Sequence, residues 1–308
     1  MIVMHPDGDL ASALWIDLLE PTAEEGERVR KATGLRVPTE GEVSEIESTS
    51  RLAFEHGAYY VSTPLVVARS GGEHELTAVG FVLSSRVLLT IRFAAHPAFD
   101  TAHDSCTAEP TKSAEDAFLR IIETIVDRSA DKLEHAGVEC DDLARVAFRS
   151  ASSRKLAATQ LSASLRRVGA VAERSSRIRD GLLGLGRIAA FVMENGIAGA
   201  PQVNASRMKA IRVDVASLAE YEGHLAGKVQ FLLDATLGFI NIEQNEIVKT
   251  LTIASVVGIP PVLVAGIYGM NFRYMPELGW RLGYPMAMGL IIVSALLPLF
   301  WFKRRGWM

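Results

Sequence analysis

Two long stretches near the C-terminal end of the chain carry no charged residue, and they constrain the fold more than any other feature. One runs from 250 to 270 and the other from 282 to 302, whereas charged residues recur every few positions from Met1 to Lys249. A helix of about 20 apolar residues spans the roughly 30 Å hydrocarbon core of a bilayer. Buried helices of soluble domains rarely run this long without a polar face. We therefore predict two transmembrane helices that form a hairpin.

The charges that flank these stretches predict the orientation of the hairpin. Lys249 precedes the first stretch and Lys303–Arg305 follow the second, while the short loop between them carries Arg273 and Arg281 against Glu277. Loops rich in Lys and Arg stay in the cytoplasm. The first ten residues also lack the basic flank and apolar run of a signal peptide. We therefore expect a multi-pass protein of the inner or cell membrane, with both termini in the cytoplasm.

The composition argues against several classes of function. Only two cysteines occur, Cys106 and Cys140, which are too few for a disulfide framework or a zinc cluster. A net charge of -4 gives no reason to expect a nucleic-acid partner. The sequence contains no phosphate-binding glycine loop, HExxH motif or nucleophile elbow. We therefore expect neither an enzyme nor a bound cofactor.

Residues 1–110 mix strand and helix patterns. The segment "SALWIDLL" is typical of a strand, and "PTAEEGERVRKATG" predicts a helix with Pro21 and Thr22 at its start and Gly34 at its end. The segment "PTEGEVSEIE" predicts the start of a second short helix. The segments "AYYVSTPLVVAR" and "ELTAVGFVLSSRVLLTIRF" are β-branched and aromatic runs separated by turn-like residues. We predict an α/β domain with a small antiparallel sheet.

The middle of the chain is helical in pattern throughout. Segment 113–148 is rich in acids and segment 145–187 is rich in arginines, so two antiparallel helices would attract each other. From Asn204 onward, apolar residues recur every three or four positions and continue into the first transmembrane stretch without a proline until Pro260. Such a helix needs partners along its whole apolar seam. Self-association into a cyclic oligomer would cover the seam and let the first spans line a pore.

The motif at the end of the first transmembrane stretch identifies a family. "YGMNF" at Tyr268–Phe272, followed by "RYMPELGWRLGYP", a second span and the basic end "KRRGWM", resembles the CorA family of divalent-cation channels. Gly269, Met270 and Asn271 match the Gly-Met-Asn signature of that family. The resemblance implies a homopentamer in which each chain has an α/β cytoplasmic domain, a long helical stalk and two C-terminal transmembrane helices.

On this interpretation the chain divides into seven segments. They are a cytoplasmic α/β domain (1–110), a charged antiparallel helical pair (111–203), a stalk helix (204–250), a pore-lining transmembrane helix (251–270), an outer loop (271–283), a second transmembrane helix (284–302) and a basic cytoplasmic tail (303–308).

The chemistry of Asn271 suits a hydrated cation. Mg²⁺ holds six waters at about 2.0–2.1 Å and loses them reluctantly. A ring of Asn271 carboxamides could accept hydrogen bonds from those waters and leave the shell intact, whereas an Asp would release the ion more slowly. Asn and Gly also favour helix C-terminal caps, so Asn271 would suit that role too. Glu277 in the outer loop could attract cations, although a surface glutamate needs no such role.

The resemblance also implies which residues line the pore. The family's pore-facing positions fall on Asn245, Val248, Leu251, Ile259, Val262 and Gly266. Most are apolar, which predicts a hydrophobic gate. Many relatives carry a hydroxyl residue at the position of Val262, and this chain does not. Pro260 and Pro261 lie in the middle of the span and predict a kink or hinge near the gate.

The family's gating implies a regulatory cation site between subunits. Asp234 falls at the family's position on the stalk, and Glu42 and Glu45 are the candidate partners from the α/β domain. Bound Mg²⁺ would neutralise like charges between subunits and hold the ring closed. In this account Mg²⁺ is both substrate and regulator.

Two alternatives remain open at this point. A ZntB-like transporter, which would move Zn²⁺ with or without protons, shares the architecture. The intact triad and the scattered histidines favour Mg²⁺ with Co²⁺ or Ni²⁺ as co-substrates. A membrane-anchored coiled-coil scaffold would explain the long helix without transport. The substrates and partners expected for the chain are thus divalent cations, the lipid bilayer and further copies of itself.

Overall fold

The computed structural model describes residues 1–6, 8–45, 52–68, 74–152, 158–194, 203–271 and 273–307. It divides the chain into two compact units. The first contains Met1–Ser152 and Ala163–Leu233, and the second contains Ser153–Ser162 and Asp234–Met308.

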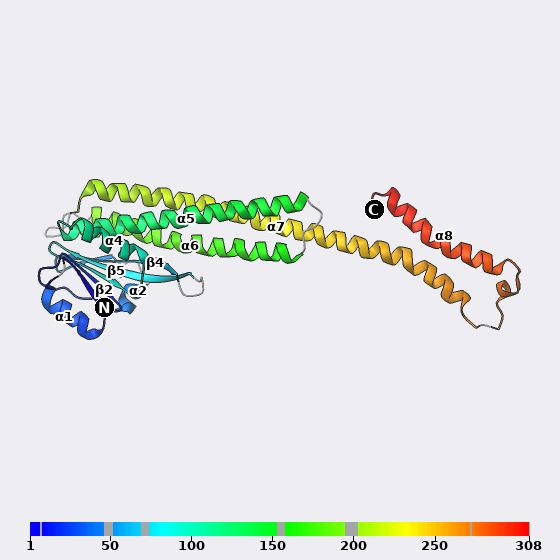
Figure 1. The fold of residues 1–308 in the computed structure, drawn as a ribbon, viewed down its shortest axis with the longest axis horizontal. Coiled ribbons are helices and arrows are strands. Elements are labelled where there is room, and N and C mark those ends of the chain that lie inside the picture. Colours follow the sequence, from blue (N-terminus) through cyan, green and yellow to red (C-terminus); the bar gives the residue numbers. More distant parts are fainter. Residues whose placement is uncertain are drawn as a thin grey trace. The chain divides into compact units, whose positions relative to one another are not determined.

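A mixed six-stranded sheet forms the base of the first unit (Figure 1). Its strands are β1 (Ile2–His5), β2 (Trp15–Leu19), β3 (Leu52–Glu55), β4 (Ala58–Ala68), β5 (His74–Ser84) and β6 (Leu88–Arg92), in the order β1-β2-β6-β5-β4-β3. The prediction of an antiparallel sheet is wrong at one place, because β2 and β6 pair in parallel. Helices and three strands separate β2 from β6 along the chain, so the chain can enter β6 from the same end of the sheet.

Alternate residues of the strands face two different hydrophobic cores. Trp15, Tyr59 and Leu83 belong to a large core that also contains residues of the long helices. Their neighbours Ile16 and Tyr60 belong to a smaller core with residues of the α1 region. The period-2 alternation of side chains places helices on both faces of the sheet.

A buried charged cluster crosses the parallel strand pair. The Asp17 carboxylate accepts hydrogen bonds from Thr90 Oγ1 at 2.6 Å and Arg92 Nη2 at 2.7 Å, and His103 Nε2 lies 3.0 Å from it. Burial would raise the pKa of Asp17, but the hydrogen bonds from His103, Arg92 and Thr90, together with the Arg92 charge, lower it below its ordinary value. Asp17 is therefore held as a carboxylate inside the domain.

Local capping chemistry sets the bounds of the two short helices that the sequence predicts. Helix α1 (Ala23–Thr33) begins with a Thr22–Glu25 capping box and ends at Gly34, which adopts the left-handed conformation with φ +76°. Helix α2 (Glu40–Ser44) begins with a second capping box, formed by Thr39 and Glu42. Both predictions are confirmed.

Helix α4 (Pro97–Ala108) was not predicted from the sequence. The segment is rich in Asp, Thr and Ser, so its composition gives a weak helical signal. The helix buries Phe99, Ala102 and Cys106 against the large core. Tertiary burial thus stabilises a helix whose intrinsic propensity is modest.

Three long helices pack together in the first unit (Figure 1). They are α5 (Ala114–Ser152), α6 (Ala158–Glu194) and the first part of α7 (Ala205–Tyr268). The predicted attraction between acidic and basic helices occurs at Glu139 on α5, which pairs with Arg174 of α6 at 2.9 Å and with Arg167 at 3.5 Å. Acids of α5 also bind α7, since Arg207 reaches Glu123 at 2.7 Å.

The apolar seam predicted on α7 packs into this bundle. Its buried members are Met208, Ile211, Val215, Leu225, Val229 and Leu232. Tyr221 is 44% exposed, and other apolar residues such as Val213 and Phe231 also stay exposed on α7. The bundle therefore covers one side of α7 and leaves apolar side chains on another.

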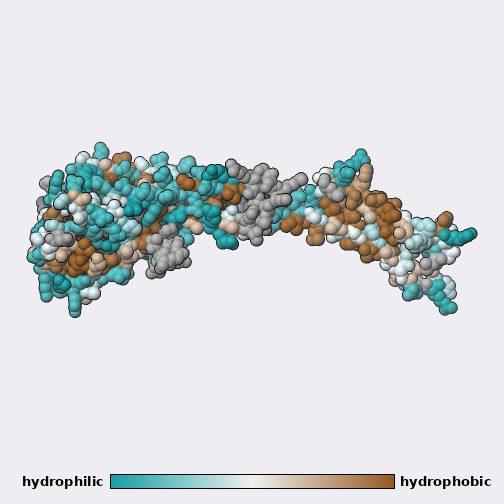
Figure 2. Space-filling model, in the orientation of Figure 1, coloured by the Kyte–Doolittle hydropathy of each residue, from teal (hydrophilic) through white to brown (hydrophobic). Residues whose placement is uncertain are grey.

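The second unit contains the rest of α7, a short 3-10 helix η1 (Pro276–Gly279) and α8 (Gly283–Arg304). Both α7 and α8 are long and apolar enough to cross a membrane. Hydrophobic residues cover the surface over this part of α7 and α8 (Figure 2). Helix α7 continues through Pro260 and Pro261 as one helix. The predicted apolar hairpin therefore presents its side chains outward rather than into a protein core.

Candidate functional site

The Gly-Met-Asn segment lies where α7 ends. The N–H of Gly269 donates to the Ala265 carbonyl at 2.9 Å, and the N–H of Met270 donates to the Ile267 carbonyl at 3.2 Å. A Cβ at position 269 would lie 3.1 Å from the Ala265 oxygen, which is tighter than ordinary contact. Gly269 therefore allows the chain to close the last turn of the helix.

Asn271 follows this turn with an exposed side chain. Its carboxamide makes no hydrogen bond to any residue that the structure describes. The backbone N–H groups of Gly269 and Met270 make the described hydrogen bonds to the last turn of α7. The carboxamide is thus available to a ligand.

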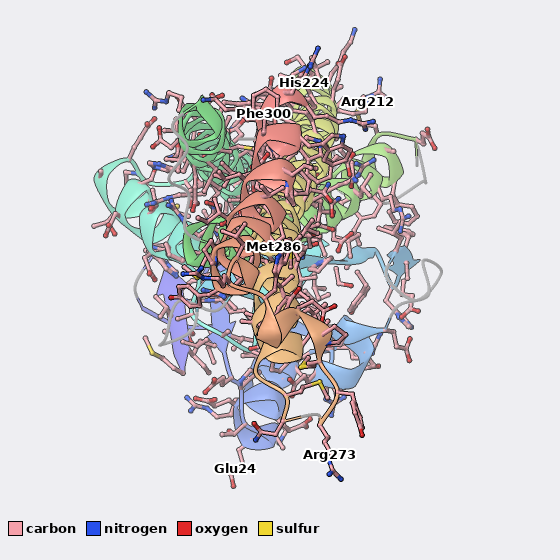
Figure 3. All side chains as sticks on the ribbon, turned by 90° about the vertical axis from the view of Figure 1, so that its right-hand side faces the viewer. Glu24, Arg212, His224, Arg273, Met286 and Phe300 are labelled. Carbon is pink, nitrogen blue, oxygen red and sulfur yellow. The ribbon has the colours of Figure 1, made fainter. Side chains whose placement is uncertain are left out.

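The loop beyond Asn271 presents polar residues. Phe272, the last residue of the quoted "YGMNF", lies outside the described residues. Arg273 extends outward from the loop (Figure 3). Glu277 lies in η1, with its carbonyl bonded to the Trp280 N–H at 3.3 Å and its side chain exposed. Nothing in the described chain fixes the Glu277 carboxylate toward Asn271.

The predicted pore-lining residues share one exposed side of α7. At about 100° per residue, five of them lie within an arc of about 80°, and the sixth lies about 40° beyond it. The five are Val248, Leu251, Ile259, Val262 and Gly266, and the sixth is Asn245. Leu251 and Val262 are 67% and 70% exposed. The single chain leaves this side uncovered.

One residue on this side of α7 was missed by the sequence analysis. The predicted positions step from Leu251 directly to Ile259, which skips one turn of the helix. Ser255, four residues from each, occupies that turn. A complete walk in steps of three and four residues would have found it.

The candidate regulatory acids lie in different units. Asp234 is exposed on α7 in the second unit, and Glu42 and Glu45 are exposed in and just after α2 in the first. Glu42 accepts hydrogen bonds from the Thr39 N–H at 2.7 Å and the Thr39 hydroxyl at 2.9 Å, and it also pairs with Arg36. The bond from the Thr39 N–H, followed by the contacts of the Thr39 hydroxyl and Arg36, lowers the pKa of Glu42.

The described parts of the chain contain no group of three His, Cys, Asp or Glu side chains placed to hold a metal ion. Asn271 itself offers a neutral carboxamide oxygen and a backbone carbonyl oxygen. Such neutral oxygens suit an ion that keeps its water shell.

Comparison with known proteins decides the family. Residues 11–304 match the family model of the CorA-like Mg²⁺ transporter protein. The chain belongs to this CorA-like family. Two CorA relatives, both named magnesium transport protein CorA, are 32% identical to it. The relative from Yersinia pseudotuberculosis aligns over 302 residues, which cover 97% of this chain and 93% of the relative. The relative from Pasteurella multocida aligns over 309 residues, with 99% and 95% covered.

Solved structures support the CorA-like fold. The complete structure of the CorA magnesium transporter from Methanocaldococcus jannaschii superposes with a TM-score of 0.76 at 18% identity, over 96% of this chain and 91% of that chain. The predicted CorA-like architecture, an α/β N-terminal domain with a long helix and two C-terminal apolar helices, is confirmed. The CorA-like family is one of transporters, in agreement with the prediction that the chain is not an enzyme.

Proposed function

We propose that this protein conducts Mg²⁺ across the inner or cell membrane, with Co²⁺ and Ni²⁺ as further substrates. The observation that carries the proposal is the unaltered Gly269-Met270-Asn271 segment directly after α7, one of two helices able to span a membrane. The 32% identity to magnesium transport proteins over almost the whole chain supports Mg²⁺ as the main ion.

Selection is proposed to occur at a ring of Asn271 side chains. The exposed carboxamide would accept hydrogen bonds from the waters of a hydrated cation. A neutral ring holds the ion weakly enough to release it, which conduction requires. Gly266 and Gly269 would allow close approach of the helices and of their carbonyl groups at this level.

A pore requires several copies of the chain. Two membrane helices cannot enclose a channel, and α7 leaves apolar residues exposed both in the first unit and along the membrane part. Symmetric packing of α7 around an axis would cover them. The family resemblance supports a homopentamer.

The apolar side chains on the proposed pore face would form the gate. These side chains offer no hydrogen bonds to water in the lumen, so a small narrowing of the pore would expel the water and block ions. They belong to Val248, Leu251, Ile259 and Val262. Pro260 lacks a backbone N–H, and so does Pro261, which weakens the helix beside Ile259 and Val262. This pair is a candidate hinge for gate movement.

Regulation is proposed to act through cytosolic Mg²⁺ at Asp234 of one subunit and Glu42 or Glu45 of a neighbour. Removal of the ion would leave like charges facing each other and loosen the ring. Glu42 would have to exchange its contacts with Thr39 and Arg36 for the ion. An ion bound at Glu42 would therefore compete with the Thr39–Glu42 capping box that begins α2.

The proposed orientation places both termini in the cytoplasm. Lys303–Arg305 follow α8, and the outer loop carries fewer basic residues. Glu277 would then face the outer solution, where its exposed carboxylate would raise the local cation concentration.

The proposal is tested by ion flux into liposomes that contain the purified protein. Mg²⁺, Zn²⁺, Co²⁺ and Ni²⁺ would compete in the presence and absence of a pH gradient. We expect Mg²⁺ to enter without a gradient and the other ions to compete with it. Preference for Zn²⁺ with dependence on the gradient would favour a ZntB-like transporter. If none of the ions entered under any internal ion condition, the scaffold alternative would replace the channel.

A further inference from the structure

The side of α7 that we propose to line the pore has a half-buried hydroxyl near its centre. Ser255 lies four residues after Leu251 and four before Ile259, so it is about 40° from each around the helix. Val262 lies seven residues on and about 20° away. Ser255 therefore lies at the centre of the proposed pore face, whereas Ile259 lies at its edge.

The Ser255 hydroxyl differs from its neighbours in its hydrogen bonds. Thr250 Oγ1 donates to the Glu246 carbonyl at 2.9 Å and Thr252 Oγ1 to the Val248 carbonyl at 2.8 Å. On α8, Ser294 Oγ donates to the Ile291 carbonyl at 2.8 Å. Ser255 Oγ makes no hydrogen bond within the described parts of the chain. Unlike these hydroxyls, it has no backbone partner.

A hydroxyl without a partner is unfavourable in contact with lipid tails, because hydrocarbon offers no hydrogen bonds. The same hydroxyl is satisfied when it faces a water-filled lumen. The unbonded state of Ser255 and its place among the proposed pore residues therefore point to the same environment. Both favour contact with water or with a hydrated ion.

The position of Ser255 along the pore matters for conduction. From Val248 to Val262 the helix rises about 21 Å, and Ser255 is the midpoint at about 10 Å from each end. Without it, the central ~80° of the pore face over this length would be lined by apolar side chains and would dewet readily. A hydroxyl ring divides the apolar stretch into two shorter ones.

We propose that Ser255 forms a second contact point for the hydrated divalent cation, deeper in the pore than Asn271. Its oxygen accepts a hydrogen bond from the water shell of the ion, and its lack of charge keeps the contact weak. The inference rests on the proposed function, since it requires α7 to line a pore. Many relatives carry a hydroxyl residue at the position of Val262, whereas the proposed pore hydroxyl of this chain, Ser255, lies seven residues before it.

An isosteric pair of variants tests the hydroxyl. Ser255→Thr keeps the oxygen, and Ser255→Val replaces that oxygen with a methyl group of similar volume. In the liposome assay we expect Ser255→Val to lower Mg²⁺ flux about tenfold, which is the loss of roughly one hydrogen bond to the ion's shell. Ser255→Thr should stay within about twofold of the wild type. Thr250→Val is the matched control, because it removes a hydroxyl that is bonded to the backbone and lies about 140° around α7 from Ser255.

The outcomes separate this inference from the proposed function. With wild-type flux intact, equal rates for Ser255→Val and Ser255→Thr would overturn the Ser255 assignment alone. Absence of flux in the wild type would overturn both.

A second measurement does not depend on how the valine variant assembles. Ser255→Cys would be treated with a charged, water-soluble thiol reagent during flux. The native thiols of Cys106 and Cys140 are buried, so the treated wild type serves as the control. We expect the reagent to block flux through Ser255→Cys only. Flux that is unaffected by the reagent would contradict a position in the lumen.

Discussion

Arg92 binds both carboxylate oxygens of Asp17 across the parallel strands β2 and β6. Arg92 Nε lies 3.2 Å from Oδ1 and 3.1 Å from Oδ2, and Arg92 Nη2 lies 2.7 Å from Oδ2. The two residues are 3% and 1% exposed. A buried pair of this kind is destabilising when it is broken, because one charge is left without compensation.

Substitution of Arg92 should therefore destabilise the protein strongly. We expect Arg92→Met to lower the free energy of unfolding by about 3–5 kcal/mol. Thermal unfolding of the full chain in detergent, followed by circular dichroism, measures the change. Glu27→Gln is the control, since its partner Arg30 is exposed and exposed pairs of this kind contribute little to stability. An equal melting temperature for the two variants would contradict this account.

His96 should make stability depend on pH. Its Nδ1 accepts the Ala98 N–H at 3.1 Å and caps α4. Burial, followed by the charges of Lys132, Arg92 and Arg128, lowers the pKa of His96 to about 4. Above pH about 6.5 the residue is neutral in both states. Below that pH the unfolded chain binds a proton that the folded chain does not, so stability falls as the pH drops toward about 4.

The variant His96→Asn isolates this effect. Asn can still cap the helix but does not titrate. Between pH 7 and pH 5 we expect the wild type to lose about 2 kcal/mol more stability than the variant. Denaturant unfolding at a series of pH values tests it. Parallel pH profiles for the two proteins would show that His96 is not the group responsible.

Two glycines of α6 should respond in opposite directions to alanine. A Cβ at Gly181 would lie 2.9 Å from the Pro64 carbonyl oxygen, and the Thr63 hydroxyl already donates to the Gly181 carbonyl at 3.2 Å. Gly181→Ala should therefore cost about 1–3 kcal/mol by pushing α6 away from β4.

Gly169 on the same helix is exposed and would place its Cβ in open space. Gly169→Ala should raise stability by up to about 1 kcal/mol through helix propensity. Melting temperatures that fall for both variants would show that the packing argument is incomplete.

Asn271→Ala should abolish selective Mg²⁺ flux. The change removes the proposed contact with the water shell but leaves every described hydrogen bond of α7 intact. We expect flux in liposomes to fall at least about tenfold, with an unchanged oligomer size by gel filtration. Normal Mg²⁺ uptake by the variant would refute the selectivity assignment.

Asp234→Ala should weaken inhibition by internal Mg²⁺. Loss of the carboxylate removes one charge from the proposed regulatory site, so more Mg²⁺ would be needed to close the pore. Flux measured against internal Mg²⁺ concentration should show the inhibition curve shifted to higher concentration. Asp214→Ala, an exposed aspartate elsewhere on α7, is the matched control. Identical curves for the wild type and Asp234→Ala would place the sensor elsewhere.

The sequence by itself determined the features that depend on neighbouring residues. The uncharged stretches in α7 and α8 follow from the length that a bilayer requires. The limits of α1 at Thr22 and Gly34 follow from capping chemistry within a few residues. The Gly-Met-Asn segment is likewise recognised from the sequence without a structure, and it indicated the family that the comparisons establish.

Only the tertiary structure decided the features that join distant segments. The parallel pairing of β2 with β6 joins residues 73 positions apart, and the Asp17–Arg92 pair joins residues 75 positions apart. Helix α4 exists because the core buries its apolar side. Only the structure shows that, among the described residues, the Ser255 hydroxyl lacks a backbone partner of the kind that Thr252 has. Periodicity shows that a residue lies on a given side of a helix, whereas packing and hydrogen bonding determine what that side contacts.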